Sequence, residues 1–279
     1  METKEQLLAR LKEIEEWEDD QKGLFFWEKI GRIPFKILDK LTPAFIQKKI
    51  GVLLDELGSF IQGGGKYLTQ KNGMLKKVQQ LVPDKTIETI DDLKTVPLNV
   101  MNIVSGDLKT NRGNVATVQG ATTGFGGVFT LAVDIPVILG LSLKTLQEIA
   151  VIYGYDPDEK EERIFIVKCL QFASADVVGK EAILNELSGY YGRSAKPADM
   201  LSKLQGWREV VYTYRDHFGL KKLLQMVPVA GMLFGAYTNR SMIKDISEAG
   251  IMLYQKRRIL ERLETESPFV LENEKGTQI

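Results

Sequence analysis

The stretch from Gly120 to Gly140, GATTGFGGVFTLAVDIPVILG, constrains the fold of this chain more than any other segment. It is apolar and rich in glycine, and Asp134 is its only charged residue. Residues 125–143 have a mean hydropathy of roughly 1.9, which is in the range of membrane-spanning helices. The nearly uncharged run 115–143 is also long enough to cross a bilayer. Against a membrane span, a carboxylate near the bilayer centre costs about 3 kcal/mol, and Pro136 weakens the helix around it.

Asp134 also gives the stretch a second interpretation, in which it is the N-cap of a helix that has Pro136 in its first turn. The stretch then forms two helices joined near residues 132–134. In a third interpretation, Asp134 is a buried carboxylate, which needs a polar partner such as Asn239 or Arg240. The sequence leaves open whether this residue is a cap or a functional acid.

Small residues recur at a spacing of four in two apolar segments. Ala116, Gly120 and Gly124 share one helix face, and Gly231 and Gly235 repeat the spacing near the C-terminus. Small residues at this spacing let two helix backbones approach closely, in membranes and in soluble cores alike. Because we find no alternating run typical of a strand, we predict an all-α protein. Its architecture is a compact multi-helix bundle with two glycine-rich apolar helical hairpins packed together.

Three parts of the chain differ in character. Residues 1–23 are predicted to form an amphipathic helical arm, residues 24–266 a single all-α domain, and residues 267–279 a polar tail. The charged N-terminus has no apolar core of a secretory signal, so we expect a cytoplasmic protein. Four aromatic residues near the N-terminus either sit at a membrane interface or dock the arm onto the domain: Trp17, Phe25, Phe26 and Trp27.

The sequence after the apolar stretch carries signals for a helix end and a new helix. Gly154 is placed to close one helix, as glycine does at the C′ position. Asp156 is predicted to cap the next, with Pro157 in its first position and Glu159 at the capping-box distance. This helix is predicted to reach Leu187.

Several function classes are excluded by motif and composition. Lys plus Arg number 37 and Asp plus Glu number 37, so no overall field attracts nucleic acid or an anionic membrane. The Walker pattern fails at Tyr67, and the dinucleotide pattern fails at Phe129, where its third glycine is required. A single Cys169 and a single His217 exclude cysteine-rich and histidine-rich metal sites. We therefore predict no nucleotide, cofactor, metal or nucleic-acid partner.

Residues 120–167 resemble the core of the EcsC protein family. The family pattern is a Gly-Ala-x-x-Gly run, then Asp-Ile-Pro, Tyr-Gly-Tyr-Asp and Glu-Arg. A second run, Pro-Val-x-Gly-x-x-x-Gly-x-x-x-Asn, precedes a final helix that contains arginine. The resemblance covers roughly residues 40–264, and together these motifs are far more specific than any glycine pattern alone. The matching positions are Gly120, Ala121, Gly124, Asp134, Ile135, Pro136, Tyr153, Gly154, Tyr155, Asp156, Glu162, Arg163, Pro228, Val229, Gly231, Gly235, Asn239, Arg257 and Arg258.

The family is named for the third gene of a bacterial operon that encodes an ABC transporter, so the resemblance implies a link to membrane transport or secretion. It brings no catalytic residues. We expect a non-enzymatic helical protein at the cytoplasmic face of the membrane, peripheral or partly inserted, with membrane lipid or a membrane transport complex as partner. The candidate functional or structural residues are Gly120, Gly124, Asp134, Pro136, Tyr153, Gly154, Asp156, Arg163, Gly231, Gly235 and Asn239.

Two alternatives belong to other classes. The first is a soluble all-α adaptor with both glycine-rich segments buried. The second is a hydrolase acting on a lipid or peptide, for which Asp134, Asp156, His217 and Asn239 are the candidates because polar groups that interrupt apolar segments acquire perturbed pKa values. The sequence does not fix the oligomeric state.

Overall fold

The computed structural model describes residues 2–21, 55, 57–64, 69, 71–125, 131–175, 177–188, 191 and 228–266. This part of the chain is helical and contains no strand, which confirms the predicted all-α bundle. The helices are α1 (Lys4–Gln21), α5 (Lys71–Leu81), α6 (Ile90–Leu93), α7 (Leu98–Phe125), α8 (Leu131–Ile152), α9 (Lys160–Ser174), α10 (Val177–Ser188) and α13 (Pro228–Glu266), and residues 57–63 are also helical.

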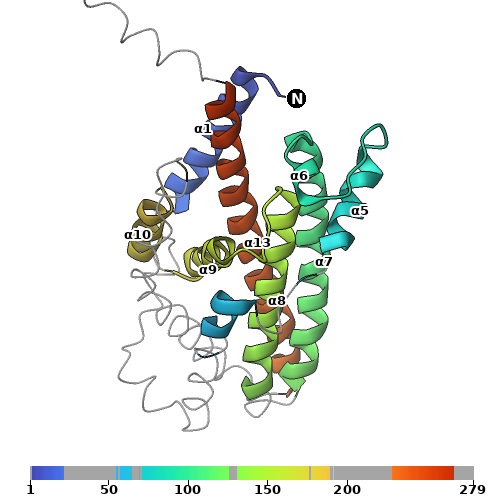
Figure 1. Ribbon diagram of the computed structural model, residues 1–279. Helices are drawn as coiled ribbons and strands as arrows, with labels where there is room; N and C mark the ends of the chain where they lie inside the picture. The colour runs from blue at the N-terminus through green and yellow to red at the C-terminus, as the bar shows by residue number, and fades with distance from the viewer. Residues whose placement is uncertain are drawn as a thin grey trace, which may run out of the picture.

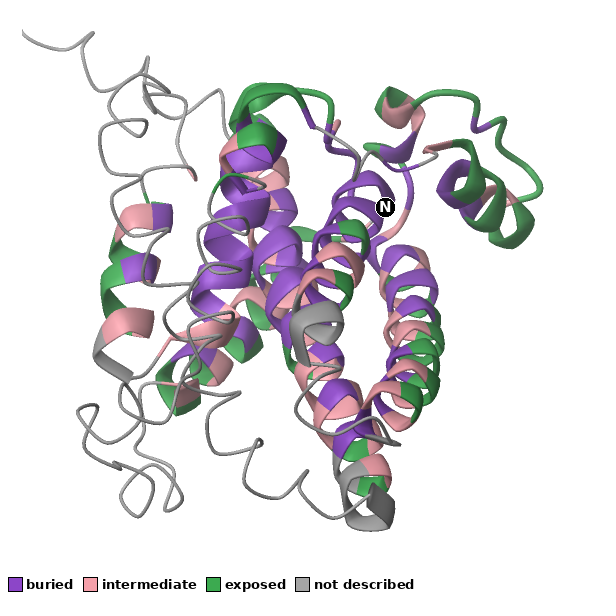
Figure 2. Ribbon diagram, turned by 90° about the horizontal axis from the view of Figure 1, so that it is seen from below, coloured by how far each residue is buried: buried purple, intermediate pink, exposed green. Residues whose placement is uncertain are grey.

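Three long helices, α7, α8 and α13, run side by side through the molecule (Figure 1). α13 is central, because it packs against α7, α8, α9 and α1. Buried residues gather where the helices meet, and exposed residues lie on the outside of the bundle (Figure 2). Ile149, Leu253 and Tyr254 are fully buried there. Hydrophobic burial along these interfaces is therefore what holds the bundle together.

The apolar stretch is divided at a different place from the one predicted. α7 ends at Phe125 and α8 runs from Leu131, so residues 132–134 lie inside a helix and do not join two helices. Asp134 lies in the first turn of α8 and is not its N-cap, and Pro136 lies inside the helix. Pro136 is the sixth residue of α8, past the first turn, so its missing N–H and its ring weaken the helix there.

The side chain of Asp134 lies outside the described residues, so its pairing with Asn239 or Arg240 stays a prediction. No helix that the structure describes is long and apolar enough to cross a membrane.

The described part of the second glycine-rich segment, from Pro228 onward, is a single helix. α13 runs without a break from Pro228 to Glu266, so this segment and the predicted last helix are one element. Pro228 occupies the first helical position, where its missing N–H is not needed. The next proline in the sequence is Pro268, which lies beyond the end of α13.

Gly154 ends α8 as predicted. Its φ is +81°, a left-handed conformation that only glycine adopts without strain. The Gly154 N–H donates to the carbonyl of Val151 and the Tyr155 N–H to that of Ala150, both at 2.9 Å. This pair of bonds is the Schellman arrangement. It turns the chain sharply and places Tyr155 and Asp156 beside the end of α8.

The predicted capping role of Asp156 is wrong. α9 begins at Lys160, its N-cap is Glu159, and no side chain caps it. Asp156 instead accepts a hydrogen bond from the N–H of Asp158 at 2.9 Å. The helix predicted to reach Leu187 is also divided, because Ala175 is extended between α9 and α10.

The N-terminal helix α1 docks onto α13. Trp17 donates its indole N–H to Glu248 at 3.1 Å, and its ring packs against Phe172 with centroids 5.6 Å apart. Lys256 pairs with Glu18 at 2.6 Å. Trp17 therefore docks the N-terminal arm onto the domain, which is one of its two predicted roles.

Candidate functional site

The backbones of α7 and α13 touch at two glycines. A β-carbon on Gly120 would lie 2.2 Å from the carbonyl oxygen of Gly235, and one on Gly235 would lie 2.3 Å from the carbonyl oxygen of Gly120. The nearest approach of Gly124 to such a carbon on Gly235 is 3.4 Å, at its α-carbon. The predicted packing of the two glycine faces is thus present at these residues. Gly231 lies in the first turn of α13, and its surroundings are outside the described residues.

Polar side chains continue this contact toward the middle of the bundle. Asn239 is buried and donates its amide to Gln119 at 3.0 Å. Arg240 donates to Asn114 at 2.8 Å and to Thr117 at 3.3 Å. These bonds cross from α13 to α7, so Asn239 helps to fix the contact between the two helices.

Large apolar side chains are exposed at this same end of the bundle. Val118 of α7 is 67% exposed, and Leu233 and Tyr237 of α13 are 70% and 71% exposed. α7 and α13 are antiparallel, since Gly120 meets Gly235 and Lys109 meets Glu248. Val118 and Tyr237 therefore lie at the same level of the bundle.

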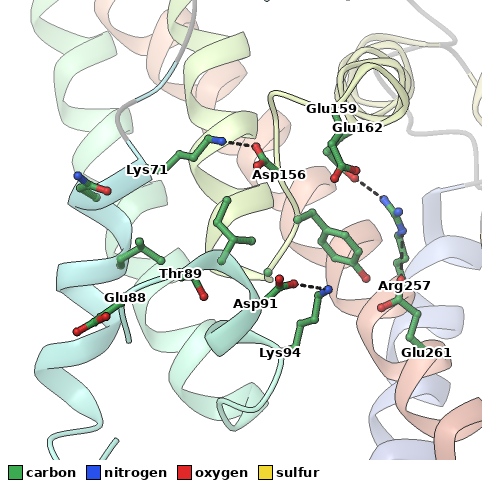
Figure 3. Close-up of a pocket in the computed structure, with 15 residues that line it drawn as sticks. Lys71, Glu88, Thr89, Asp91, Lys94, Asp156, Glu159, Glu162, Arg257 and Glu261 are labelled. Carbon is green, nitrogen blue, oxygen red and sulfur yellow. Dashed lines mark hydrogen bonds and ion pairs between the residues drawn. The ribbon is translucent and has the colours of Figure 1, made fainter. Parts of the chain in front are cut away.

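A second candidate site lies toward the other end, where Gly154, Tyr155 and Asp156 line a cavity of about 550 Å³. Its walls come from α5, α6, the turn between α8 and α9, and the C-terminal half of α13 (Figure 3). Charged side chains dominate it. Arg257, which lines this cavity, lies 18 residues after Asn239 on α13. Eighteen helical residues span about 27 Å. The two candidate sites are therefore separate.

Lys71 binds two carboxylates in the turn that precedes α9. Its ammonium lies 2.5 Å from a carboxylate oxygen of Asp156 and 2.5 Å from one of Asp158. Partial burial works to lower the pKa of Lys71, but its bonds to the two carboxylates outweigh this and raise the pKa. Asp156 is therefore an ion-paired residue that fixes the turn to α5.

Arg258 connects α13 to the end of α8. Its guanidinium donates to the carbonyl of Tyr153 at 2.9 Å and to that of Gly154 at 3.2 Å, and it also bonds Glu261 at 2.8 Å. Arg258 is buried, and its guanidinium lies 4.4 Å from the centroid of the Tyr155 ring. It satisfies carbonyl groups that a helix end leaves without partners.

Glu162 is a buried carboxylate with two partners. It accepts a hydrogen bond from the Tyr254 hydroxyl and pairs with Arg257 at 2.8 Å. Burial raises the pKa of Glu162, and the neighbouring Arg257 opposes this rise. The Arg257 guanidinium also stacks 4.1 Å from the centroid of the Tyr155 ring. A buried carboxylate of this kind stays charged only while its cation is present.

Arg163, the arginine of the predicted Glu-Arg motif, connects two parts of the backbone. It donates to the carbonyls of Ile61 at 2.9 Å, Gln62 at 3.0 Å and Asp158 at 2.5 Å. It thereby joins the end of the helix at residues 57–63 to the start of α9. Tyr153 is fully buried, and its hydroxyl donates to Asn102 at 2.7 Å.

The four residues of the hydrolase alternative are not brought together in the described part of the chain. Asp156 is paired with Lys71, and Asn239 belongs to the glycine contact. His217 and the side chain of Asp134 lie outside the described residues. Within the described ranges, no group of three His, Cys, Asp or Glu residues is placed to hold a metal ion. Burial raises the pKa of Cys169 well above its usual value, so this thiol stays protonated and unreactive.

Sequence comparison places these features in a family. The model of the EcsC protein family matches residues 9–259, which extends the predicted resemblance toward the N-terminus. The uncharacterized protein YdbA of Bacillus subtilis (strain 168) is 61% identical over 266 residues, covering 95% of this chain and 97% of that protein. Protein EcsC of the same strain is 25% identical over 166 residues, covering 60% of this chain and 67% of that protein. No solved structure matches the chain. Because the family model spans most of its length, the chain belongs to the EcsC protein family.

Proposed function

We propose that this chain is a non-enzymatic helical protein that associates peripherally with the cytoplasmic face of the membrane, through the end of the bundle where α7 and α13 meet at their glycines. The observation that carries the proposal is the exposure of Val118, Leu233 and Tyr237, each about two-thirds or more open to solvent. Exposed apolar side chains that cluster on one face mark interaction surfaces.

The chemistry of these side chains favours a lipid interface. Leucine and valine gain free energy on transfer from water to an apolar phase, and tyrosine prefers the boundary between the two. Leu233 and Tyr237 are four residues apart and so share one face of α13, while Val118 is exposed on α7 at the same level of the bundle. The family resemblance adds a transport or secretion complex as the setting in which such a protein would act.

Replacing the two exposed residues of α13 with acids tests this proposal. The double variant Leu233→Glu, Tyr237→Glu should lose most of its flotation with liposomes. Each substitution replaces an apolar side chain that inserts into lipid with a carboxylate, which is costly to move out of water. The measurement is the fraction of purified full-length protein that floats with vesicles in a density gradient. Both side chains point to solvent, so the melting temperature should change little.

The matched control is Leu81→Glu at the C-terminal end of α5, where an apolar side chain is also exposed, at 46%. It should float like the unaltered protein. If the unaltered protein does not float with vesicles at low salt, or if the double variant floats as well as the control, the membrane proposal is wrong.

A further inference from the structure

We propose that one stripe of α13, formed by Leu233, Tyr237, Arg240 and Lys244, docks this protein on anionic lipid, with the two apolar side chains inserted and the two cations at the level of the lipid phosphates. This inference rests on the proposed membrane association and adds its lipid class, its orientation and its charged residues. We call these four residues the docking stripe.

The docking stripe is one face of one helix. Its members are separated by four, three and four residues, a spacing that keeps side chains on the same side of an α-helix. The apolar pair is nearest the helix start, and the cations follow toward the middle of the bundle. At a rise of about 1.5 Å per residue, Lys244 lies about 10 Å along the axis from Tyr237. That length matches the depth of about 5–10 Å to which interfacial helices insert their apolar side chains.

The charged side chains of the docking stripe have one sign. Residues 113–124 of α7, 136–147 of α8 and 232–244 of α13 contain three charged residues, Lys144, Arg240 and Lys244, and all are cationic. The nearest acids along these helices are Asp134, two residues before the α8 range and with its side chain outside the described residues, Glu148 and Asp245. The chain as a whole carries equal numbers of acidic and basic residues, so this local excess is a property of the fold. An anionic membrane surface attracts such a cluster.

The two cations are held on the surface between α7 and α13. Arg240 is oriented by its bonds to Asn114 and Thr117, both of which it reaches through Nη1. The alkyl chain of Lys244 passes close to Gly113, since a β-carbon there would lie 3.5 Å from it. Among the described residues, neither cation forms an ion pair with a carboxylate. Guanidinium has five N–H donors, so Arg240 retains donors for a phosphate oxygen.

This docking fixes the orientation of the molecule. Arg257, in the charged cavity, lies 20 residues after Tyr237 on the same continuous helix, a separation of about 30 Å. The cavity formed by Asp156, Glu162 and Arg257 would therefore face the cytoplasm, well above the bilayer.

The test compares two vesicle compositions with one pair of variants. The unaltered full-length protein should bind vesicles of phosphatidylcholine with phosphatidylglycerol, and its binding to phosphatidylcholine alone should be far weaker. Arg240→Gln with Lys244→Gln should weaken binding to the anionic vesicles roughly 25-fold, because each basic residue at such a surface contributes about 1 kcal/mol. The control Lys76→Gln with Lys77→Gln removes the same charge from two exposed residues of α5 and should bind like the unaltered protein.

The outcomes separate this inference from the proposal beneath it. If the unaltered protein binds both vesicle types equally, membrane association stands and the anionic docking stripe is overturned. If the α5 control loses as much affinity as the α13 variant, net charge rather than the stripe is responsible, and the inference is again overturned. If the protein binds neither vesicle type, the proposed membrane association fails as well.

Discussion

Replacing Gly120 with alanine will destabilise this protein by about 3 kcal/mol, the upper part of the range for overpacked cores. The added methyl group would lie 2.2 Å from the carbonyl oxygen of Gly235. That oxygen belongs to the backbone of α13, so no side-chain rotation relieves the clash. Relief requires α7 and α13 to move apart, which disrupts the contacts of the two longest helices. Urea unfolding followed by circular dichroism measures the effect.

Gly106→Ala is the matched control, because it places the same methyl group in the same helix. No atom lies within 4 Å of a β-carbon at Gly106. Alanine is a better helix former than glycine, so this variant should be more stable by about 0.5–1 kcal/mol. Equal effects at the two positions would show that α7 and α13 do not meet at Gly120, and the account of the glycine contact would be wrong.

Replacing Arg257 with alanine will destabilise the protein by about 3–5 kcal/mol at neutral pH, the usual result of removing one partner from a buried ion pair. Glu162 is only 3% exposed and would be left with the Tyr254 hydroxyl as its remaining described partner. A buried carboxylate without a cation is costly. Adding Glu162→Gln to this variant should recover much of the stability, because the uncompensated charge is then gone.

The loss should also depend on pH. Burial raises the pKa of Glu162 above the ordinary value of 4.5, and removal of Arg257 takes away the charge that opposes this rise. A carboxyl group with a raised pKa in the folded state stabilises that state at low pH, and this contribution is lost as pH rises through the folded-state pKa. The stability deficit of Arg257→Ala should therefore shrink between pH 7 and pH 5. A deficit that is constant with pH and unaffected by Glu162→Gln would show that Arg257 acts by packing alone.

The close approach of α7 and α13 was predictable because its signal is local. Small residues four apart define a helix face whatever surrounds it, and Gly120 and Gly235 carried that signal in both segments. Gly154 was predictable for the same reason, since a C′ glycine is set by its own conformation. The helix start in the apolar stretch was misplaced because Asp134 and Pro136 together are a typical start signal, yet both lie inside α8. An internal proline is costly, so the local signals favoured a helix start there over the continuous helix that the structure shows.

The roles of the charged residues could not be predicted, because they depend on partners distant in sequence. Asp156 has every local feature of an N-cap, but Lys71 of α5 binds it in the folded protein. The family pattern pointed to Arg258 without indicating that it bonds the carbonyl of Tyr153. The exposure of Tyr237 likewise depends on which face of α13 the other helices leave open.

The central claim is that the protein is a peripheral component of the membrane, and fractionation of cells that produce the tagged full-length chain tests it most directly. Membranes are pelleted and then washed with alkaline carbonate, which releases proteins held by surface contacts. We predict that the protein sediments with the membranes and that carbonate releases it, while the variant Leu233→Glu, Tyr237→Glu stays in the supernatant before any wash. A protein that never sediments with the membranes, or one that carbonate does not release, would contradict this account.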